Sequence, residues 1–196
     1  MHRLLEELAA IPPLEWSAVL LALGYLVLAV RGSRWCWPFA LLSSTAYAVL
    51  FASGALYMQV VLQVFYVAMA VYGWVSWTRA DASPDPGRGV HRWDLRRHAV
   101  AVGGVLLLSA VSAAVLAGRT DAVAPYVDSL VTWGSVLATW MVARKVLENW
   151  LYWVALDSIA AGLYASQGFR ATALLFLIYA TVAVRGYVVW RRGLDA

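Results

Sequence analysis

The sequence predicts an all-α membrane protein with seven transmembrane helices, arranged as two parallel-oriented three-helix repeats joined by a connector helix. Its composition, the lengths of its apolar runs and its internal similarity all favour this fold class. Of the 196 residues, 63% are apolar and 13% are charged, and the mean hydropathy is +0.71. Soluble domains have roughly 45–50% apolar and about 25% charged residues. The surplus of apolar side chains therefore indicates a chain solvated by lipid.

A helix needs about 20 mainly apolar residues to cross a bilayer, and the chain has seven runs near that length. In order they are Leu14–Val30, Trp35–Ser53, Ala55–Trp77, Ala99–Ala117, Val123–Ala143, Val146–Ser166 and Phe169–Trp190. The first run is the shortest. Pro38 lies near the start of the second, where a proline costs a helix little. We therefore expect seven spans.

The spans predict one membrane domain over residues 1–196. We expect a first three-helix bundle at residues 14–77, a connector helix at residues 99–117 and a second three-helix bundle at residues 123–192. Residues 78–98 contain the stretch ASPDPGRG, whose prolines and glycines are typical of a loop.

Basic residues are distributed unevenly between the two sides of the membrane. Alternating spans place Arg3, Arg119 and Arg170 on one side and the other 12 of the 15 Lys and Arg residues on the opposite side. The positive-inside rule makes the second side cytoplasmic. The N-terminus is then outside, and the C-terminus and the loop 78–98 are in the cytoplasm. Because the net charge of +4 follows this topology, it does not indicate a nucleic-acid partner.

The chain also resembles itself. A shift of 113 residues aligns Ala29–Arg79 with Val142–Arg192 and gives 14 identities in 51 ungapped positions. Shared apolar composition explains poorly the matched pairs Arg31/Arg144, Trp37/Trp150, Tyr66/Tyr179, Gly73/Gly186, Trp77/Trp190 and Arg79/Arg192. We interpret them as a duplication of three spans, with the fourth span returning the second triplet to the same orientation. Transporters with such repeats bind substrate between the halves near the midplane.

Polar side chains are expensive at membrane depth unless they have a task. The stretch ENWLYWVALD, from Glu148 to Asp157, is therefore a candidate site. At 100° per residue, one helix face carries Asn149, Trp153, Asp157 and Tyr164. Other spans carry further stripes: Gln59, Gln63, Tyr66, Gly73 and Trp77; Asp128, Thr132, Ser135 and Thr139; and Trp37, Ser44 and Tyr47. If the two halves face each other, the stripes of the third and sixth spans line one cavity.

Each of these residues also has a purely structural interpretation. Ser and Thr in membrane helices usually hydrogen-bond the backbone or help packing, which we expect for Ser44, Thr132, Ser135 and Thr139. Trp residues near span ends usually belong to the interfacial belt, which we expect for Trp16, Trp77, Trp93 and Trp190. The two interpretations are balanced for Trp37 and Trp150. Trp153 lies a turn deeper and favours a cavity role, and Asp157, far from the basic helix ends, favours a carboxylate on the pathway.

The inventory of reactive groups argues against several classes of site. Cys36 is the single cysteine, and the three histidines have no metal-ligand spacing, so we expect no metal. A phosphate-binding G-x-x-x-x-G-K-[ST] loop is absent from the sequence, so we expect no nucleotide hydrolysis. Rings beside amides and carboxylates suit a flat, partly cationic heterocycle that carries hydroxyl groups. We expect no cofactor and no catalytic residue.

At these residues the chain resembles a known family, the bacterial nicotinamide riboside transporters called PnuC. The resemblance rests on ARKVLENWLYWVALD at Ala143–Asp157, LYMQVVLQVFYVAMAVYGWVSW at Leu56–Trp77 and YVDS at Tyr126–Ser129. It extends over nearly the whole chain. The R-K-x-x-E-N-W-x-x-W string is specific, and the L-Q-x-F…Y-G-W-x-x-W string is moderately so.

The resemblance implies a multi-pass protein of the bacterial cytoplasmic (inner) membrane, similar in fold to full-length sugar transporters of the SWEET type, that forms homotrimers. It implies facilitated diffusion of nicotinamide riboside, trapped by a cytoplasmic kinase, with thiamine, riboflavin or deoxynucleosides as the substrates of other subgroups. Carried over by motif, Asn149 and Trp153 contact the substrate, with Gln63 opposite. The full set of candidate substrate-binding residues is Gln63, Tyr66, Asp128, Asn149, Trp153, Asp157, Tyr164 and Trp37.

Two other classes of function remain as alternatives to a transporter. A membrane-embedded enzyme could use Asp128 and Asp157 as an acid–base pair, although neither has a histidine near it in the sequence. A helical scaffold or receptor would bind without transport. Uptake without chemical change separates a transporter from both.

Overall fold

The computed structural model describes residues 13–53, 57–82, 89–119, 124–166 and 170–194, and within them the chain is all-α. Seven helices follow in order: α2 (Pro13–Val30), α3 (Cys36–Ser53), α4 (Tyr57–Asp81), α5 (Leu95–Arg119), α6 (Pro125–Ala143), α7 (Asn149–Ser166) and α8 (Arg170–Leu194). The described residues contain no strand, only an isolated bridge between His91 and Val146. An all-α fold of seven helices is confirmed.

Two of the helical stretches are long and apolar enough to cross a membrane on length and composition alone. They are Leu95–Gly118 in α5 and Ala173–Leu194 in α8. Trp16–Val30 and Cys36–Ala52 are apolar but shorter. Only 11% of the apolar window of α5 is buried, so most of its side chains face outward.

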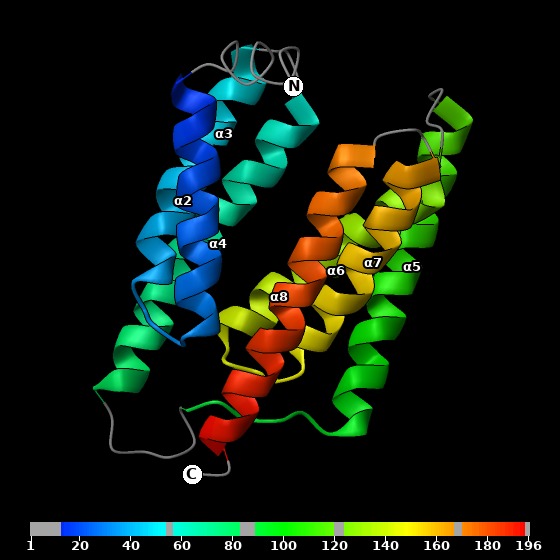
Figure 1. The fold of residues 1–196 in the computed structure, drawn as a ribbon. Helices are drawn as coiled ribbons and strands as arrows, with labels where there is room; N and C mark the ends of the chain where they lie inside the picture. The colour runs from blue at the N-terminus through cyan, green and yellow to red at the C-terminus, as the bar shows by residue number, and fades with distance from the viewer. Residues whose placement is uncertain (1–12, 54–56, 83–88, 120–123, 167–169, 195–196) are drawn as a thin grey trace. The chain divides into compact units, whose positions relative to one another are not determined.

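The chain divides into two compact units, Met1–Ala82 (unit 1) and Ser83–Ala196 (unit 2). In unit 1, α3 packs against both α2 and α4 (Figure 1). In unit 2 the helices pack in chain order, α5 on α6, α6 on α7 and α7 on α8. Helix α4 continues to Asp81 and α5 already begins at Leu95, so both helices extend into the segment 78–98 that the sequence assigned to a loop.

Helix starts follow from local residues. Pro13 and Pro125 occupy first positions of α2 and α6, where the missing N–H group is not needed. Asp94 precedes α5 and caps it, because its Oδ1 accepts a 2.7 Å hydrogen bond from the backbone N–H of Arg97.

The α2–α3 and α6–α7 turns have the same backbone. Gly32 and Lys145, which are 113 residues apart, both have left-handed φ, 67° and 55°. The N–H groups of both donate 2.9 Å hydrogen bonds, to Ala29 O and Val142 O respectively. Four further bonds recur in the same register at 3.0–3.4 Å, donated by Arg31/Arg144, Ser33/Val146, Cys36/Asn149 and Trp37/Trp150.

Each of the two units has its own tryptophan core, and the two cores have the same geometry. In unit 1 the buried rings of Trp37 and Trp77 meet edge to face, with centroids 5.5 Å apart and an interplanar angle of 89°. In unit 2 the buried rings of Trp150 and Trp190 meet at 5.4 Å and 89°.

These cores contradict the positions expected for Trp77 and Trp190. Trp77 and Trp190 are 0% and 3% exposed, so they are core residues and their assignment to the interfacial belt was wrong. They are buried because Trp37 and Trp150 each lie flat on a glycine, Gly73 and Gly186, which brings the neighbouring helix close. By contrast, Trp16 is 40% exposed.

Candidate functional site

The first turn of α7 holds Asn149 in a closed environment. Its side chain is 0% exposed, and its Nδ2 donates a 2.6 Å hydrogen bond to Val146 O in the α6–α7 turn. Its Oδ1 has no hydrogen-bond partner among the described residues. A buried acceptor without a partner costs roughly 1–3 kcal/mol. The amide therefore holds the turn with one end and offers an acceptor with the other.

Trp153 and Asp157 follow Asn149 at successive turns of α7, as the helical spacing predicted. Trp153 is half-buried, so part of its ring is accessible. Asp157 is only 6% exposed. Among the three, the ring of Trp153 is the group that an incoming molecule can reach.

The deeper part of α7 faces aromatic residues of α8. Tyr164 stacks on Phe176, with centroids 5.3 Å apart and an angle of 20°, and Phe176 meets Tyr179 edge to face at 5.9 Å. Tyr179 also lies within electrostatic range of Asp157. Tyr179 was not among the predicted site residues, although its repeat partner Tyr66 was. The 113-residue alignment was the signal that could have found it.

The remaining aromatic and amide candidates, Trp37, Gln63 and Tyr66, belong to unit 1. Trp37 is 1% exposed and packs on Gly73, and the Nε1 of its ring has no hydrogen-bond partner among the described residues. Gln63 and Tyr66 lie half-buried on α4, and Tyr66 is tilted against Phe65 at 5.6 Å. Gln59, from the same stripe, lies outside the side chains that the structure describes.

Asp128 lies apart from the other acidic candidate. It is exposed in the first turn of α6, 15 residues before this helix ends at Ala143. Asp157 comes eight residues after the start of α7, which packs back along α6. At 1.5 Å per residue, the two carboxylates differ by about 10 Å along the helix axes. Asp128 is therefore level with Tyr164 and not with Asp157.

Hydroxyl groups in these helices bond mainly to the backbone. Thr139 donates to Ser135 O at 2.7 Å, four residues earlier, and Ser158 donates to Val154 O at the same distance. The Ser43 hydroxyl bridges helices by donating to Ala18 O at 2.9 Å. For Thr139 this is the structural role that the sequence predicted.

The segment before α5 is fastened to the start of α7. His91 and the α6–α7 turn exchange two backbone hydrogen bonds, His91 N to Lys145 O at 3.1 Å and Leu147 N to His91 O at 2.8 Å. Glu148 Oε2 accepts a 3.2 Å hydrogen bond from the backbone N–H of Trp93.

His98, on α5, makes two further contacts with the start of α7. His98 Nε2 lies 3.9 Å from Glu148 Oε2, and His98 Nδ1 lies 2.9 Å from the hydroxyl of Tyr152. The rings of His98 and Tyr152 stack at 5.8 Å. This cluster was not predictable from the sequence, because it joins residues about fifty positions apart.

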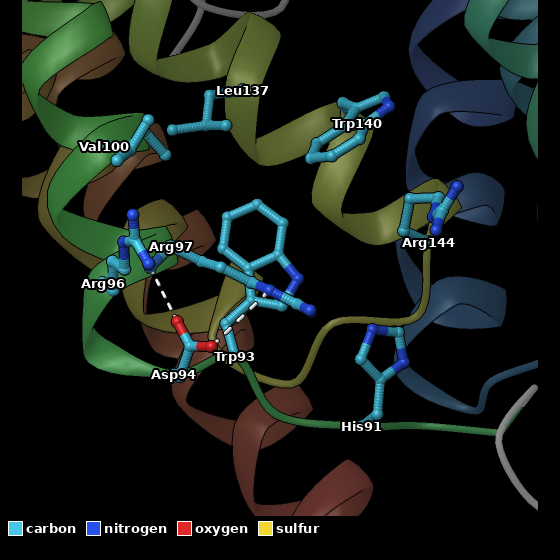
Figure 2. Close-up of a pocket in the computed structure, with 10 residues that line it drawn as sticks. His91, Trp93, Asp94, Arg96, Arg97, Val100, Leu137, Trp140 and Arg144 are labelled. Carbon is cyan, nitrogen blue, oxygen red and sulfur yellow. Dashed lines mark hydrogen bonds and ion pairs between the residues drawn. The ribbon is translucent and has the colours of Figure 1, made fainter.

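A pocket of about 750 Å³ opens where α5 begins and α6 ends (Figure 2). Its polar lining includes His91, Arg97 and Arg144, and Trp93 and Trp140 supply aromatic walls. None of the candidate substrate-binding residues lines it. Among the described residues, no three His, Cys, Asp or Glu side chains gather as metal ligands would.

The chain is similar to known vitamin transporters. It is 26% identical over 176 residues to the nicotinamide riboside transporter PnuC of Escherichia coli (strain K12), which covers 78% of this chain and 74% of that protein. The identity is also 26%, over 182 residues, to the riboflavin/roseoflavin transporter RibM of Streptomyces davaonensis, covering 89% of this chain and 84% of that protein.

A solved structure and a family model agree with these relatives. The crystal structure of the vitamin B3 transporter PnuC matches 91% of this chain and 80% of its own with a TM-score of 0.70 at 19% identity, which shows a shared fold. The family model described as nicotinamide mononucleotide transporter matches residues 12–192, so the resemblance seen in the sequence motifs is confirmed. Because this match extends over nearly the whole chain, the protein belongs to the nicotinamide mononucleotide transporter family.

Proposed function

We propose that this protein takes up nicotinamide riboside across a bacterial cytoplasmic membrane by facilitated diffusion. The observation that carries the proposal is the α7 face, where the accessible ring of Trp153 lies between the buried polar groups of Asn149 and Asp157. In a member of this transporter family, that face has the chemistry which a cationic aromatic nucleoside requires.

Each group on the face has a distinct proposed role. The Trp153 ring stacks on the planar heterocycle. The Oδ1 of Asn149, which has no hydrogen-bond partner among the described residues, accepts a hydrogen bond from a hydroxyl group once the first turn of α7, where it is buried in this structure, opens to the substrate. The carboxylate of Asp157, which lies within electrostatic range of Tyr179, favours positive charge. Trp37, Gln63, Tyr66, Asp128 and Tyr164 remain proposed contacts of the same substrate, and Gln63 is the one that the motif resemblance supports best.

Riboflavin is a second candidate substrate. The similarity to RibM reaches the same 26% identity as that to PnuC and covers more of this chain, 89% against 78%. A stacking tryptophan accepts any flat ring system, so the α7 face does not choose between the two vitamins. Thiamine, a cationic aromatic that the family resemblance implies as the substrate of another subgroup, belongs in the same comparison.

An enzymatic function has less support. Asp128 and Asp157 are offset by about 10 Å along the helix axes, and Asp128 is exposed whereas Asp157 is buried, so the two carboxylates do not face one common site. The named relatives are transporters. We propose that the chain changes no bond in its substrate.

We further propose that the helices form two parallel three-helix repeats, α2–α4 and α6–α8, with α5 as the connector. The duplicated turn around Gly32 and Lys145 supports this. With all seven helices spanning, the basic residues favour an outside N-terminus and a cytoplasmic C-terminus. A C-terminal reporter should be active only in its cytoplasmic form, and cleavage within residues 78–98, between the apolar parts of α4 and α5, by external protease in intact cells would contradict the topology.

Two proposed partners follow from the family resemblance alone. One is a second and third copy of the chain in a homotrimer, and the other is a cytoplasmic kinase that phosphorylates the imported vitamin. A kinase supplies the direction, because facilitated diffusion by itself only equalises concentrations.

Uptake into sealed proteoliposomes tests the function. Radiolabelled nicotinamide riboside, riboflavin and thiamine are offered separately, and the internal label is identified chemically. We expect unchanged nicotinamide riboside to equilibrate, and to accumulate further when a nicotinamide riboside kinase and ATP are enclosed. Faster uptake of riboflavin would reassign the substrate. Conversion of the compound without a kinase, or binding without uptake, would overturn the transporter proposal.

A further inference from the structure

The pocket between the start of α5 and the end of α6 has a composition that the transport proposal does not use. Its volume is about 750 Å³, and basic, aromatic and apolar side chains each line one part of it (Figure 2). We propose that it binds the phosphate headgroup of an anionic phospholipid, with an acyl chain lying along α5. In the proposed topology this lipid belongs to the cytoplasmic leaflet.

The polar part of the pocket carries an excess of positive charge. Arg96, Arg97 and Arg144 line it together with a single carboxylate, Asp94. Asp94 is engaged locally, because it caps α5 and its Oδ2 lies 3.6 Å from Arg97 Nε. It offsets one guanidinium and leaves a net attraction for an anion. Basic pockets between helices on the cytoplasmic side are typical sites for anionic headgroups.

The aromatic part of the pocket lies next to these arginines. The rings of Trp93 and Trp140 meet at 5.5 Å and 59°, and the guanidinium carbon of Arg144 lies 5.8 Å from the centre of the Trp140 ring. Tryptophan is enriched at the depth of lipid headgroups, because its ring is apolar and its N–H is polar. These two rings therefore mark the level at which a headgroup would sit.

The apolar part continues out of the pocket along one face of α5. Val100 lines the pocket and is 71% exposed, and Leu107 and Val111, on the same helix face, are 66% and 57% exposed. Between them, Gly104 has no atom within 4 Å of the position of a Cβ. We call Val100, Gly104, Leu107 and Val111 the α5 strip.

The basic and aromatic parts of the pocket lie together where α5 begins and α6 ends, and the apolar part continues from them along α5, which matches a phospholipid from headgroup to acyl chain. A water-soluble phosphate compound would use only the first of these three parts. The length of the α5 strip beyond the pocket therefore favours a lipid over a soluble anion as the occupant.

Lipid titration of the full-length protein in detergent, followed by native mass spectrometry, tests the site. We expect one dioleoyl phosphatidylglycerol to be retained per chain, with dioleoyl phosphatidylcholine retained much more weakly. The Arg97→Gln/Arg144→Gln double variant should lose roughly thirtyfold in phosphatidylglycerol affinity. The matched control, Arg79→Gln/Arg192→Gln, removes two basic residues outside the pocket and should bind like the parent. Equal losses in both would mean general surface charge and would overturn the site.

Two further arms test the identity of the occupant. Glycerol 3-phosphate should not displace the lipid at comparable concentration, and displacement would reassign the pocket to a soluble phosphate compound. Gly104→Leu fills the α5 strip where space is open, and it should weaken lipid retention about tenfold or more, whereas Gly162→Leu on α7 should not. If Gly104→Leu instead changes the number of copies in the assembly and no lipid is retained by the parent, the α5 strip is an interface between copies and the lipid proposal fails.

Discussion

The ring of Trp150 lies directly on the backbone of Gly186, so that a Cβ built on Gly186 would stand 2.5 Å from ring carbon Cδ2. Ordinary van der Waals contact begins near 3.4 Å. The ring has little freedom to withdraw, because it is 2% exposed and the ring of Trp190 packs edge to face against it. Gly73 and Trp37 repeat the arrangement in unit 1.

This contact predicts that Gly186→Ala destabilises the protein. Alanine gains up to about 1 kcal/mol of helix propensity over glycine, whereas overpacking a tight core costs roughly 1–3 kcal/mol. Gly162→Ala on α7 is the matched control, because open space surrounds it and only the propensity gain applies. Thermal unfolding in detergent should place Gly186→Ala about 1–3 kcal/mol below Gly162→Ala. Equal stabilisation by both variants would show that the ring yields.

The same tryptophans show where sequence reasoning succeeded and where it failed. Run length located all seven helices, because a bilayer demands about 20 apolar residues whatever their neighbours. Position near a span end then assigned Trp77 and Trp190 to the interfacial belt, which was wrong. Their burial depends on glycines of the same helices that admit the rings of Trp37 and Trp150. The repeat alignment already matched these two glycines and four tryptophans in pairs. Only the structure shows that in each unit one tryptophan ring packs on the glycine and against the other tryptophan.

The candidate site was predictable in part. Helical spacing correctly placed Asn149, Trp153 and Asp157 at successive turns of α7, because that relation is local. The contacts of Glu148 with Trp93 and His98 were not predictable, since they join residues 55 and 50 positions apart that share no periodic pattern. Helix ends beyond the apolar runs, such as Asp81, were also missed, because a helix can continue into water once its apolar part is formed.

The duplicated turn predicts that alanine is costly at one of its two equivalent positions and nearly neutral at the other. Gly32→Ala places a Cβ at a left-handed φ of 67° and should cost about 1–2 kcal/mol. Lys145→Ala keeps a Cβ at a φ of 55°, where one already exists, so its backbone cost should be near zero. Thermal unfolding of the two variants in the same detergent provides the comparison. A loss at position 145 as large as that at position 32 would mean that the Lys145 side chain, and not the backbone, stabilises the turn.

The contact between Glu148 and the segment before α5 predicts that removing its carboxylate changes hydrogen exchange locally. Glu148→Ala removes the carboxylate that accepts the Trp93 N–H at 3.2 Å. A hydrogen bond to a charged group contributes about 1.5–3 kcal/mol, so exchange of the Trp93 amide should accelerate roughly ten- to hundredfold if it opens locally. Asp81→Ala, which removes the partner of Arg34 in unit 1, is the control and should leave that amide unchanged. An unaltered rate in Glu148→Ala would show that the two backbone bonds of His91 hold the segment alone.

The substrate proposal is tested most directly at Trp153. Stacking of a flat ring on an aromatic side chain is worth about 1–3 kcal/mol, so Trp153→Ala should weaken nicotinamide riboside binding roughly ten- to hundredfold. Asn149→Leu should also weaken binding, but it breaks the 2.6 Å bond to Val146 O and so disturbs the turn as well. Trp153→Ala is the cleaner variant, because the half-buried ring has no hydrogen bond to the turn among the contacts of the described residues.

Trp35→Ala serves as the control for that experiment. Trp35 is 57% exposed just before α3 and meets Trp74 edge to face, so its removal also deletes an indole and an aromatic contact, but outside the proposed site. Binding is measured by calorimetry on purified protein, with unfolding temperature recorded for each variant. If Trp153→Ala binds like the parent while Trp35→Ala does not, the substrate does not stack on α7. The polar groups of Asn149 and Asp157 would then serve packing alone, and the ring that receives the vitamin would have to be sought in another helix.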